Sequence, residues 1–97
     1  MQVEWDPEKD RENRIKHGLG FDEVRILFES DTDYLVIYDE EHSEDEDRFL
    51  AIGPIAKGVV TVAHTEPRED VIRIIGARMA TRSEEEAFYA RTGGRKR

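Results

Sequence analysis

Histidine, lysine and arginine are the side chains through which this sequence could carry out chemistry. The chain has 3 histidines and 15 lysines and arginines but no cysteine, which excludes thiolate nucleophiles and thiolate zinc sites. Histidine titrates near neutral pH and can transfer protons, and arginine binds two phosphate oxygens at once. These residue types suit metal-free RNA cleavage, in which a base activates a 2′-hydroxyl, an acid protonates the leaving 5′-oxygen and cations stabilise the phosphate.

His17 is the leading candidate for proton transfer. It lies between Lys16 and Gly18, at the predicted end of the first helix. Position alone favours a structural role, in which His17 interacts with the helix dipole and binds the last carbonyls.

Three arginines are candidates for phosphate binding, and each has a structural alternative. Arg48 begins a strand after an acidic loop, where an ion pair with a neighbouring acid is the commoner role. Arg73 alternates with Ile72 and Ile74, so it can simply face solvent. Arg78 lies between the last strand and the final helix, where helix capping fits equally well.

Other notable residues are predicted to be structural. His64 is expected to be a packed or edge residue of its strand, and Trp5 to belong to the core. Glu66 could act as a base, but a turn carboxylate usually has no such role. The sequence has no HExxH motif, no glycine-rich phosphate loop and no histidines at metal-ligand spacing, so we predict no metal and no cofactor. The acidic segment 39–47 lacks the glycine and spacing of an EF-hand.

Charge is distributed unevenly along the 97 residues. Residues 1–47 hold 17 acids and 5 lysines or arginines, a net charge of −12, whereas residues 48–97 hold 6 acids and 10 lysines or arginines, a net charge of +4. This asymmetry indicates a charged partner or a solvated acidic surface, and charge alone favours the surface. The N-terminus is polar and no apolar run is long enough to span a bilayer, so we expect a cytoplasmic protein with no membrane segment.

Local patterns predict an α+β domain. Asp6 and Pro7 should start a helix that ends near His17, and Gly18 should terminate it. Further helices are expected at 22–29 and from Thr81 or Ser83 onward, with strands at 2–5, 33–39, 48–56, 59–65 and 71–77. We predict N-terminal helices packed on an antiparallel sheet, followed by a C-terminal helix, with residues 1–90 as one domain and 91–97 as a flexible basic tail.

Three sets of residues, read in chain order, resemble the BrnT family of toxins. The sets cover most of the chain and comprise Glu4 to Lys9 with Asn13, Lys16 to Gly18, Phe21 and Glu23; His42, Ser43, Glu46, Arg48, Phe49, Ile52 and Gly53; and Thr65, Glu66, Arg73 to Thr81, Glu84 to Glu86 and Tyr89. Gly76, Asp10 and Arg14 depart from the family pattern, which often has serine, a small residue and an aliphatic residue there.

The resemblance implies a RelE-like fold and a ribonuclease toxin that halts translation as one half of a type II toxin–antitoxin pair. The implied partner is a BrnA-like ribbon-helix-helix antitoxin in a hetero-oligomer, with operator DNA bound only through that antitoxin. Matched positions imply His17, Arg48 and Arg78 as catalytic residues. They also imply Lys9, Lys16 and Arg73 as residues that bind the RNA substrate.

Two alternatives to an active enzyme stay open. The chain could be a degenerate toxin that serves as a non-catalytic, antitoxin-binding corepressor, which the acidic net charge and polar first helix favour. Direct DNA binding by this chain alone is weakly supported, because no predicted helix has a basic recognition face.

Overall fold

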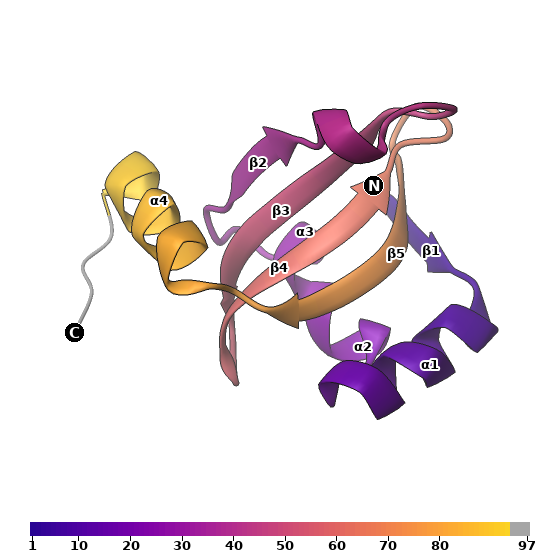
Figure 1. The fold of residues 1–97 in the computed structure, drawn as a ribbon, viewed down its shortest axis with the longest axis horizontal. Helices are drawn as coiled ribbons and strands as arrows, with labels where there is room; N and C mark the ends of the chain where they lie inside the picture. The colour runs from indigo at the N-terminus through magenta and orange to yellow at the C-terminus, as the bar shows by residue number, and fades with distance from the viewer. Residues whose placement is uncertain (94–97) are drawn as a thin grey trace.

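The computed structural model describes residues 1–93 as a five-stranded sheet with helices on both faces (Figure 1). The elements are, in chain order, β1 (Gln2–Trp5), α1 (Pro7–His17), α2 (Phe21–Val24), α3 (Ile26–Glu29), β2 (Leu35–Tyr38), the 3₁₀ turn η1 (Glu40–His42), β3 (Arg48–Ile55), β4 (Gly58–Thr65), β5 (Val71–Met79) and α4 (Arg82–Thr92). The predicted α+β class is confirmed.

The sheet has the strand order β1-β5-β4-β3-β2. Strands β2 to β5 pair antiparallel in chain order, as predicted; short turns join β3 to β4 and β4 to β5, and residues 39–47 join β2 to β3. However, β1 pairs with β5 in parallel, so the prediction of a wholly antiparallel sheet is wrong. A short loop forces the two strands that it joins to pair antiparallel. Because α1, α2 and α3 lie between β1 and the next strand, no short loop sets the direction of β1.

Successive strand residues point to opposite faces, and each face has its own apolar cluster. On the face covered by α1, α2 and α3, the larger cluster includes Phe21, Leu27 and Ile74. The opposite face, which we call the α4 face, has a smaller cluster in which Phe88 of α4 packs with Ile52 and Val59. The α4 helix covers only one end of its face (Figure 1), so the far ends of β3, β4 and β5 extend beyond it.

Capping residues set the helix ends largely as predicted. The Asp6 carboxylate accepts a hydrogen bond from the Glu8 N–H, and Gly18 ends α1 with a left-handed φ of 69°. Of the two predicted starts for the last helix, Thr81 is the observed N-cap, and it forms a capping box with Glu84.

Several element boundaries differ from the predictions. The helix expected at 22–29 is interrupted at Arg25 and forms α2 and α3. The α4 helix includes Arg91 and Thr92, which belong to the predicted tail, and residues 94–97 of that tail lie outside the described residues. Pro54 lies in β3 beyond Ile52, the last residue paired with β2. Because no β2 residue lies opposite Pro54, its missing N–H does not weaken the β2–β3 pairing.

Candidate active site

Asn13 attaches α1 to the sheet. Strand β1 pairs with β5 only as far as Ile74, so the next part of β5 has no strand beside it. There the Asn13 side chain replaces a strand: its Nδ2 donates to the Ala77 carbonyl at 2.9 Å, and the Ala77 N–H donates to its Oδ1 at 3.1 Å. Nδ2 also donates to the Leu19 carbonyl at 2.9 Å. These bonds explain why α1 buries an asparagine while Ile15, its one aliphatic residue, is 83% exposed.

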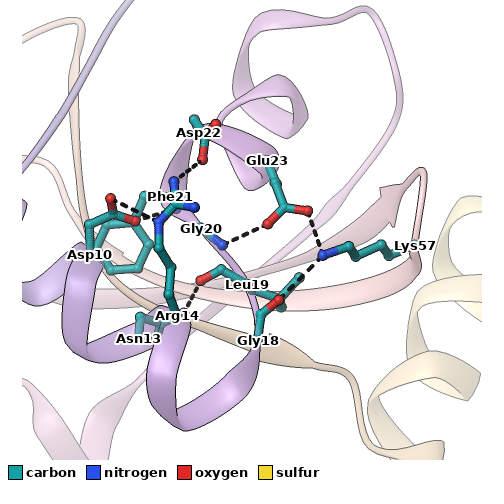
Figure 2. A network of polar contacts seen from close by, with 10 residues as sticks. All are labelled: Asp10, Asn13, Arg14, Gly18, Leu19, Gly20, Phe21, Asp22, Glu23 and Lys57. Atoms are coloured by element: carbon teal, nitrogen blue, oxygen red, sulfur yellow. Dashed lines mark hydrogen bonds and ion pairs between the residues drawn. The ribbon is translucent and has the colours of Figure 1, made fainter.

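A network of ion pairs fixes the corner between α1 and α2 (Figure 2). Arg14 contacts Asp22 at 2.7 Å, and the Asp10 carboxylate accepts the Phe21 N–H at 2.8 Å. The side-chain hydrogen bond from Arg14 to Asp10 raises the pKa of Arg14. Asp10 and Arg14, which depart from the family pattern, therefore join α1 to the start of α2.

Lys57 anchors the other side of this corner (Figure 2). Its Nζ lies 2.7 Å from a Glu23 oxygen and 3.3 Å from the Gly18 carbonyl oxygen. The second Glu23 oxygen accepts the Gly20 N–H at 2.8 Å. The Gly20 hydrogen bond, followed by that of Lys57, lowers the pKa of Glu23. The chain just after His17 is thus held by a hairpin more than 35 residues away.

A cavity beside this fixed helix end is lined by the two lysines of α1 and by His17. We call it the α1 groove; its volume is about 240 Å³, and its lining residues are Lys9, Glu12, Asn13, Lys16, His17, Ile75 and Gly76. Lys9, Lys16 and His17, all predicted site residues, are therefore brought together. A Cβ on Gly76 would meet Asn13 Oδ1 at 3.8 Å, an ordinary contact, so the serine common in the family would fit.

Arg48 and Arg73 lie on the α4 face on either side of Thr65. Thr65 pairs with Arg48 on β3 and with Arg73 on β5, which separates the two arginine backbones by two strand spacings, about 10 Å. Arg73 lies 2.8 Å from Glu4, whose other oxygen contacts Arg68 at 2.8 Å. Hydrogen bonds from Arg68 and Arg73 lower the pKa of Glu4. Arg48, by contrast, forms no ion pair with any residue in the described part of the chain.

Arg78 is bound to the capping residue of α4. Its two terminal nitrogens donate to the two Glu84 oxygens at 2.7 and 2.9 Å. Thr61 Oγ1 and the Thr81 N–H also donate to Glu84, each at 2.9 Å. The Arg78 hydrogen bond is the main reason that the pKa of Glu84 falls to about 2. The alternative in which Arg78 supports the helix start therefore has a physical basis.

The predicted site residues fall into three places. His17, Lys9 and Lys16 share the α1 groove, Arg48 and Arg73 flank Thr65, and Arg78 contacts Glu84. None of the three arginines lines the α1 groove, which His17 lines. The α1 groove nevertheless reaches β5 at Ile75 and Gly76, between Arg73 and Arg78 along the strand.

Of the residues predicted to be structural, His64 is buried and Trp5 is partly buried against the core, whereas the turn residue Glu66 is exposed. His64 is 1% exposed, stacks on Phe49 at 5.7 Å and meets Phe28 edge-on at 5.1 Å. Burial lowers the pKa of His64. Trp5 packs edge-on against Phe21 at 6.1 Å. These contacts confirm the packed role for His64 and the core role for Trp5.

Sequence reasoning missed Asn13 and Thr65 as individual residues. Asn13 lies four residues after Lys9 and three before Lys16, so helical spacing could have placed all three on one face. Thr65 carries no signal of this kind, because its place between Arg48 and Arg73 depends on strand register.

Two further properties concern the described residues as a whole. Residues 1–93 contain no group of three or more histidines or carboxylates placed to hold a metal ion. None of the helices in this range is long and apolar enough to cross a membrane.

Comparison with known proteins identifies the class. The fold is similar to that in the crystal structure of the Brucella abortus ribonuclease toxin BrnT, with a TM-score of 0.62, 23% identity, and coverage of 84% of this chain and 99% of that chain. The family model described as "Ribonuclease toxin, BrnT, of type II toxin-antitoxin system" matches residues 5–84. The chain therefore belongs to the BrnT family of ribonuclease toxins. A search of curated proteins found no match.

Proposed function

We propose that this chain is an endoribonuclease toxin with a RelE-like fold, which cleaves RNA without a metal ion and so inhibits translation. The α1 groove is the observation that carries the proposal, because Lys9, Lys16 and His17 line one cavity beside β5. Its two lysines outnumber its one acid, Glu12, on a chain of net charge −8, and binding a polyanion requires such a local excess of positive charge.

The reaction assigned to the groove is an internal transesterification. His17 accepts the 2′-hydroxyl proton or supplies the proton for the leaving 5′-oxygen. The 2′-oxygen forms a bond to the adjacent phosphorus and the bond to the 5′-oxygen breaks, which yields a 2′,3′-cyclic phosphate and a 5′-hydroxyl. Lys9 and Lys16 hold the phosphate and offset its charge as the transition state forms.

The arginines are assigned to the phosphates on either side. The groove reaches β5 between Arg73 and Arg78, so a strand of RNA that crosses this edge would pass from the groove to the α4 face. Arg48 has no ion-pair partner within residues 1–93, so it can bind a phosphate without breaking an ion pair, although four acids of the 39–47 loop line the same cavity. Arg78 would exchange its Glu84 contact for substrate.

The partner is proposed to be a BrnA-like ribbon-helix-helix antitoxin that forms a hetero-oligomer with the toxin in the cytoplasm and binds operator DNA. Membership of a type II family supports an antitoxin partner. The toxin would contact operator DNA only through this partner, since the net charge of −8 disfavours direct binding to a polyanion.

A second candidate is a non-catalytic toxin that acts as an antitoxin-binding corepressor. Two of the expected phosphate ligands are already engaged, Arg73 by Glu4 and Arg78 by Glu84. If these pairs persist in solution, substrate would compete with an internal carboxylate at each position.

Growth arrest on induced expression tests the proposal. His17→Ala and Arg78→Ala should each relieve the arrest at equal protein level, whereas Arg82→Ala, an exposed neighbour, should not. Glu84→Gln separates loss of activity from loss of stability, because it removes the ion pair of Arg78 but keeps the arginine. Full arrest by both alanine variants would refute the assigned residues.

A further inference from the structure

Strand β2 presents an apolar edge that the described part of the chain leaves uncovered. It is the last strand in the sheet order, and Val36, Ile37 and Tyr38 are 46, 39 and 49% exposed. The Asp39 N–H donates to the Arg48 carbonyl, so by antiparallel alternation the N–H and C=O groups of Val36 and Tyr38 point away from β3. Such an edge can pair with a further strand.

Acidic side chains follow this edge. Residues 39–47 contain seven acids and no lysine or arginine. The ion pair between Asp39 and His42 at 2.9 Å is the one formed within this segment, and Asp47 accepts the Tyr38 hydroxyl at 3.1 Å. The remaining five acids have no cationic partner in residues 1–93. By contrast, α1 and α2 contain several acids paired with lysine or arginine, among them Asp22 and Glu23.

A cavity of about 450 Å³ lies beside this acidic loop. It is lined by four of the unpaired carboxylates together with His42, Arg48 and Thr65; the carboxylates are Glu41, Glu44, Asp45 and Glu46. Thr65 is 2% exposed and its Oγ1 has no hydrogen-bond partner, although a buried hydroxyl normally has one. The cavity therefore carries an excess of negative charge, which suits a guanidinium or ammonium group, and it borders a threonine whose buried hydroxyl has no partner.

We propose that the β2 edge binds an extended, basic segment of the antitoxin, which adds a strand next to β2 and places an arginine or lysine side chain against the loop acids that line this cavity. The added strand would use the outward backbone groups of Val36 and Tyr38 and cover their side chains. This inference rests on the proposed function, which supplies the antitoxin as the partner. The consequence of binding would be inhibition, since the inserted side chain would exclude RNA from Arg48.

Charge distinguishes this occupant from two others. A second copy of the chain paired antiparallel through β2 would place each acidic loop beside Asp31 and Asp33 of the other copy, and RNA bound along β2 would meet the acids of residues 39–47. A basic peptide segment instead gains ion pairs with carboxylates that have none, so its association should weaken as salt rises.

The test is titration calorimetry of the purified toxin with its cognate antitoxin. Val36→Pro removes an outward N–H that the β2–β3 pairing does not use, and Val36→Thr keeps that N–H as the matched control. The triple variant Glu44→Lys, Asp45→Lys, Glu46→Lys reverses the loop charge, and Glu69→Lys reverses an exposed acid in another turn. We expect at least a tenfold weaker Kd for Val36→Pro and for the triple variant, and less than a twofold change for the two controls.

Binding within twofold of wild type by both the proline and the triple variant would overturn the proposal. The triple variant keeps the test valid if Val36→Pro does not fold, because the changed residues are exposed and outside the sheet. Sedimentation of the free toxin should give a monomer, and a dimer abolished by Val36→Pro would assign the edge to a second copy instead. Neither variant touches the α1 groove, so RNA cleavage by the free toxin should persist. If wild-type toxin binds the antitoxin but does not cleave RNA, the proposed function is contradicted and the proposed interface is not.

Discussion

Asn13→Ala should destabilise the protein by about 2–3 kcal/mol, although the residue lies in a polar helix that contributes little apolar surface to the core. The Asn13 side chain makes three hydrogen bonds, two to the backbone of Ala77 and one to the Leu19 carbonyl. Alanine would leave one buried N–H and two buried carbonyls without these partners.

The magnitude follows from the cost of those three groups. A buried hydrogen bond contributes about 1 kcal/mol, and a buried group left unsatisfied costs about 1–3 kcal/mol. Because Asn13 lines the α1 groove, water can reach part of the vacated space, which places the loss near the lower value for each group. Alanine also favours the helix by about 0.6 kcal/mol, which offsets part of the loss.

Urea unfolding followed by circular dichroism measures the effect, with Glu12→Ala as the exposed control on the same helix. The control should change the free energy of unfolding by less than about 0.5 kcal/mol. Asn13→Asp keeps the acceptor for the Ala77 N–H but cannot donate to either carbonyl, so it should be at least as destabilising at pH 7. If Asn13→Ala unfolds within about 0.5 kcal/mol of wild type, Asn13 does not join α1 to β5 in solution.

Three further predictions concern stability and its pH dependence. Gly53→Ala should cost about 1–3 kcal/mol in urea unfolding, because its Cβ would lie 2.5 Å from Leu27, whereas Gly76→Ala should be neutral or stabilising, and equal effects would contradict the packing at both sites. Burial lowers the pKa of His64, so neutral His64 stabilises the fold fully above the unfolded pKa of about 6.5, and this stability is lost as pH falls towards the folded pKa. The free energy of unfolding of His64→Phe should therefore depend less on pH between 7.5 and 5.5 than that of wild type. An equal pH dependence in the two proteins would count against this. The pKa of Glu84 is lowered to about 2, so its contribution is present above 4.5 and lost as pH falls through 2; Glu84→Gln should lose about 1 kcal/mol at pH 7 and little at pH 2, by thermal unfolding at both values.

The element boundaries that could be predicted are those with a local cause. Asp6 and Gly18 bound α1 because capping involves residues only a few positions apart, and the same holds for Thr81 with Glu84 at the start of α4. The parallel pairing of β1 with β5 could not be predicted, because nothing near β1 in the sequence specifies a strand that begins at Val71.

The candidate site shows the same division. Lys9, Lys16 and His17 meet in one groove because their spacing repeats on one face of a helix, which the sequence contains. The contact between Arg78 and Glu84 could be predicted only in part. The capping-box spacing predicts that Glu84 accepts the Thr81 N–H, but it does not predict which other side chain binds Glu84.

Incubation of a defined RNA with the purified protein in EDTA is the most direct test of the central claim. Wild type should cleave the RNA and leave a 2′,3′-cyclic phosphate, and His17→Ala should not cleave, with urea unfolding showing that the variant is folded. Equal cleavage by His17→Ala would contradict the α1 groove as the active site. No cleavage by wild type in EDTA would contradict cleavage of free RNA without a metal ion.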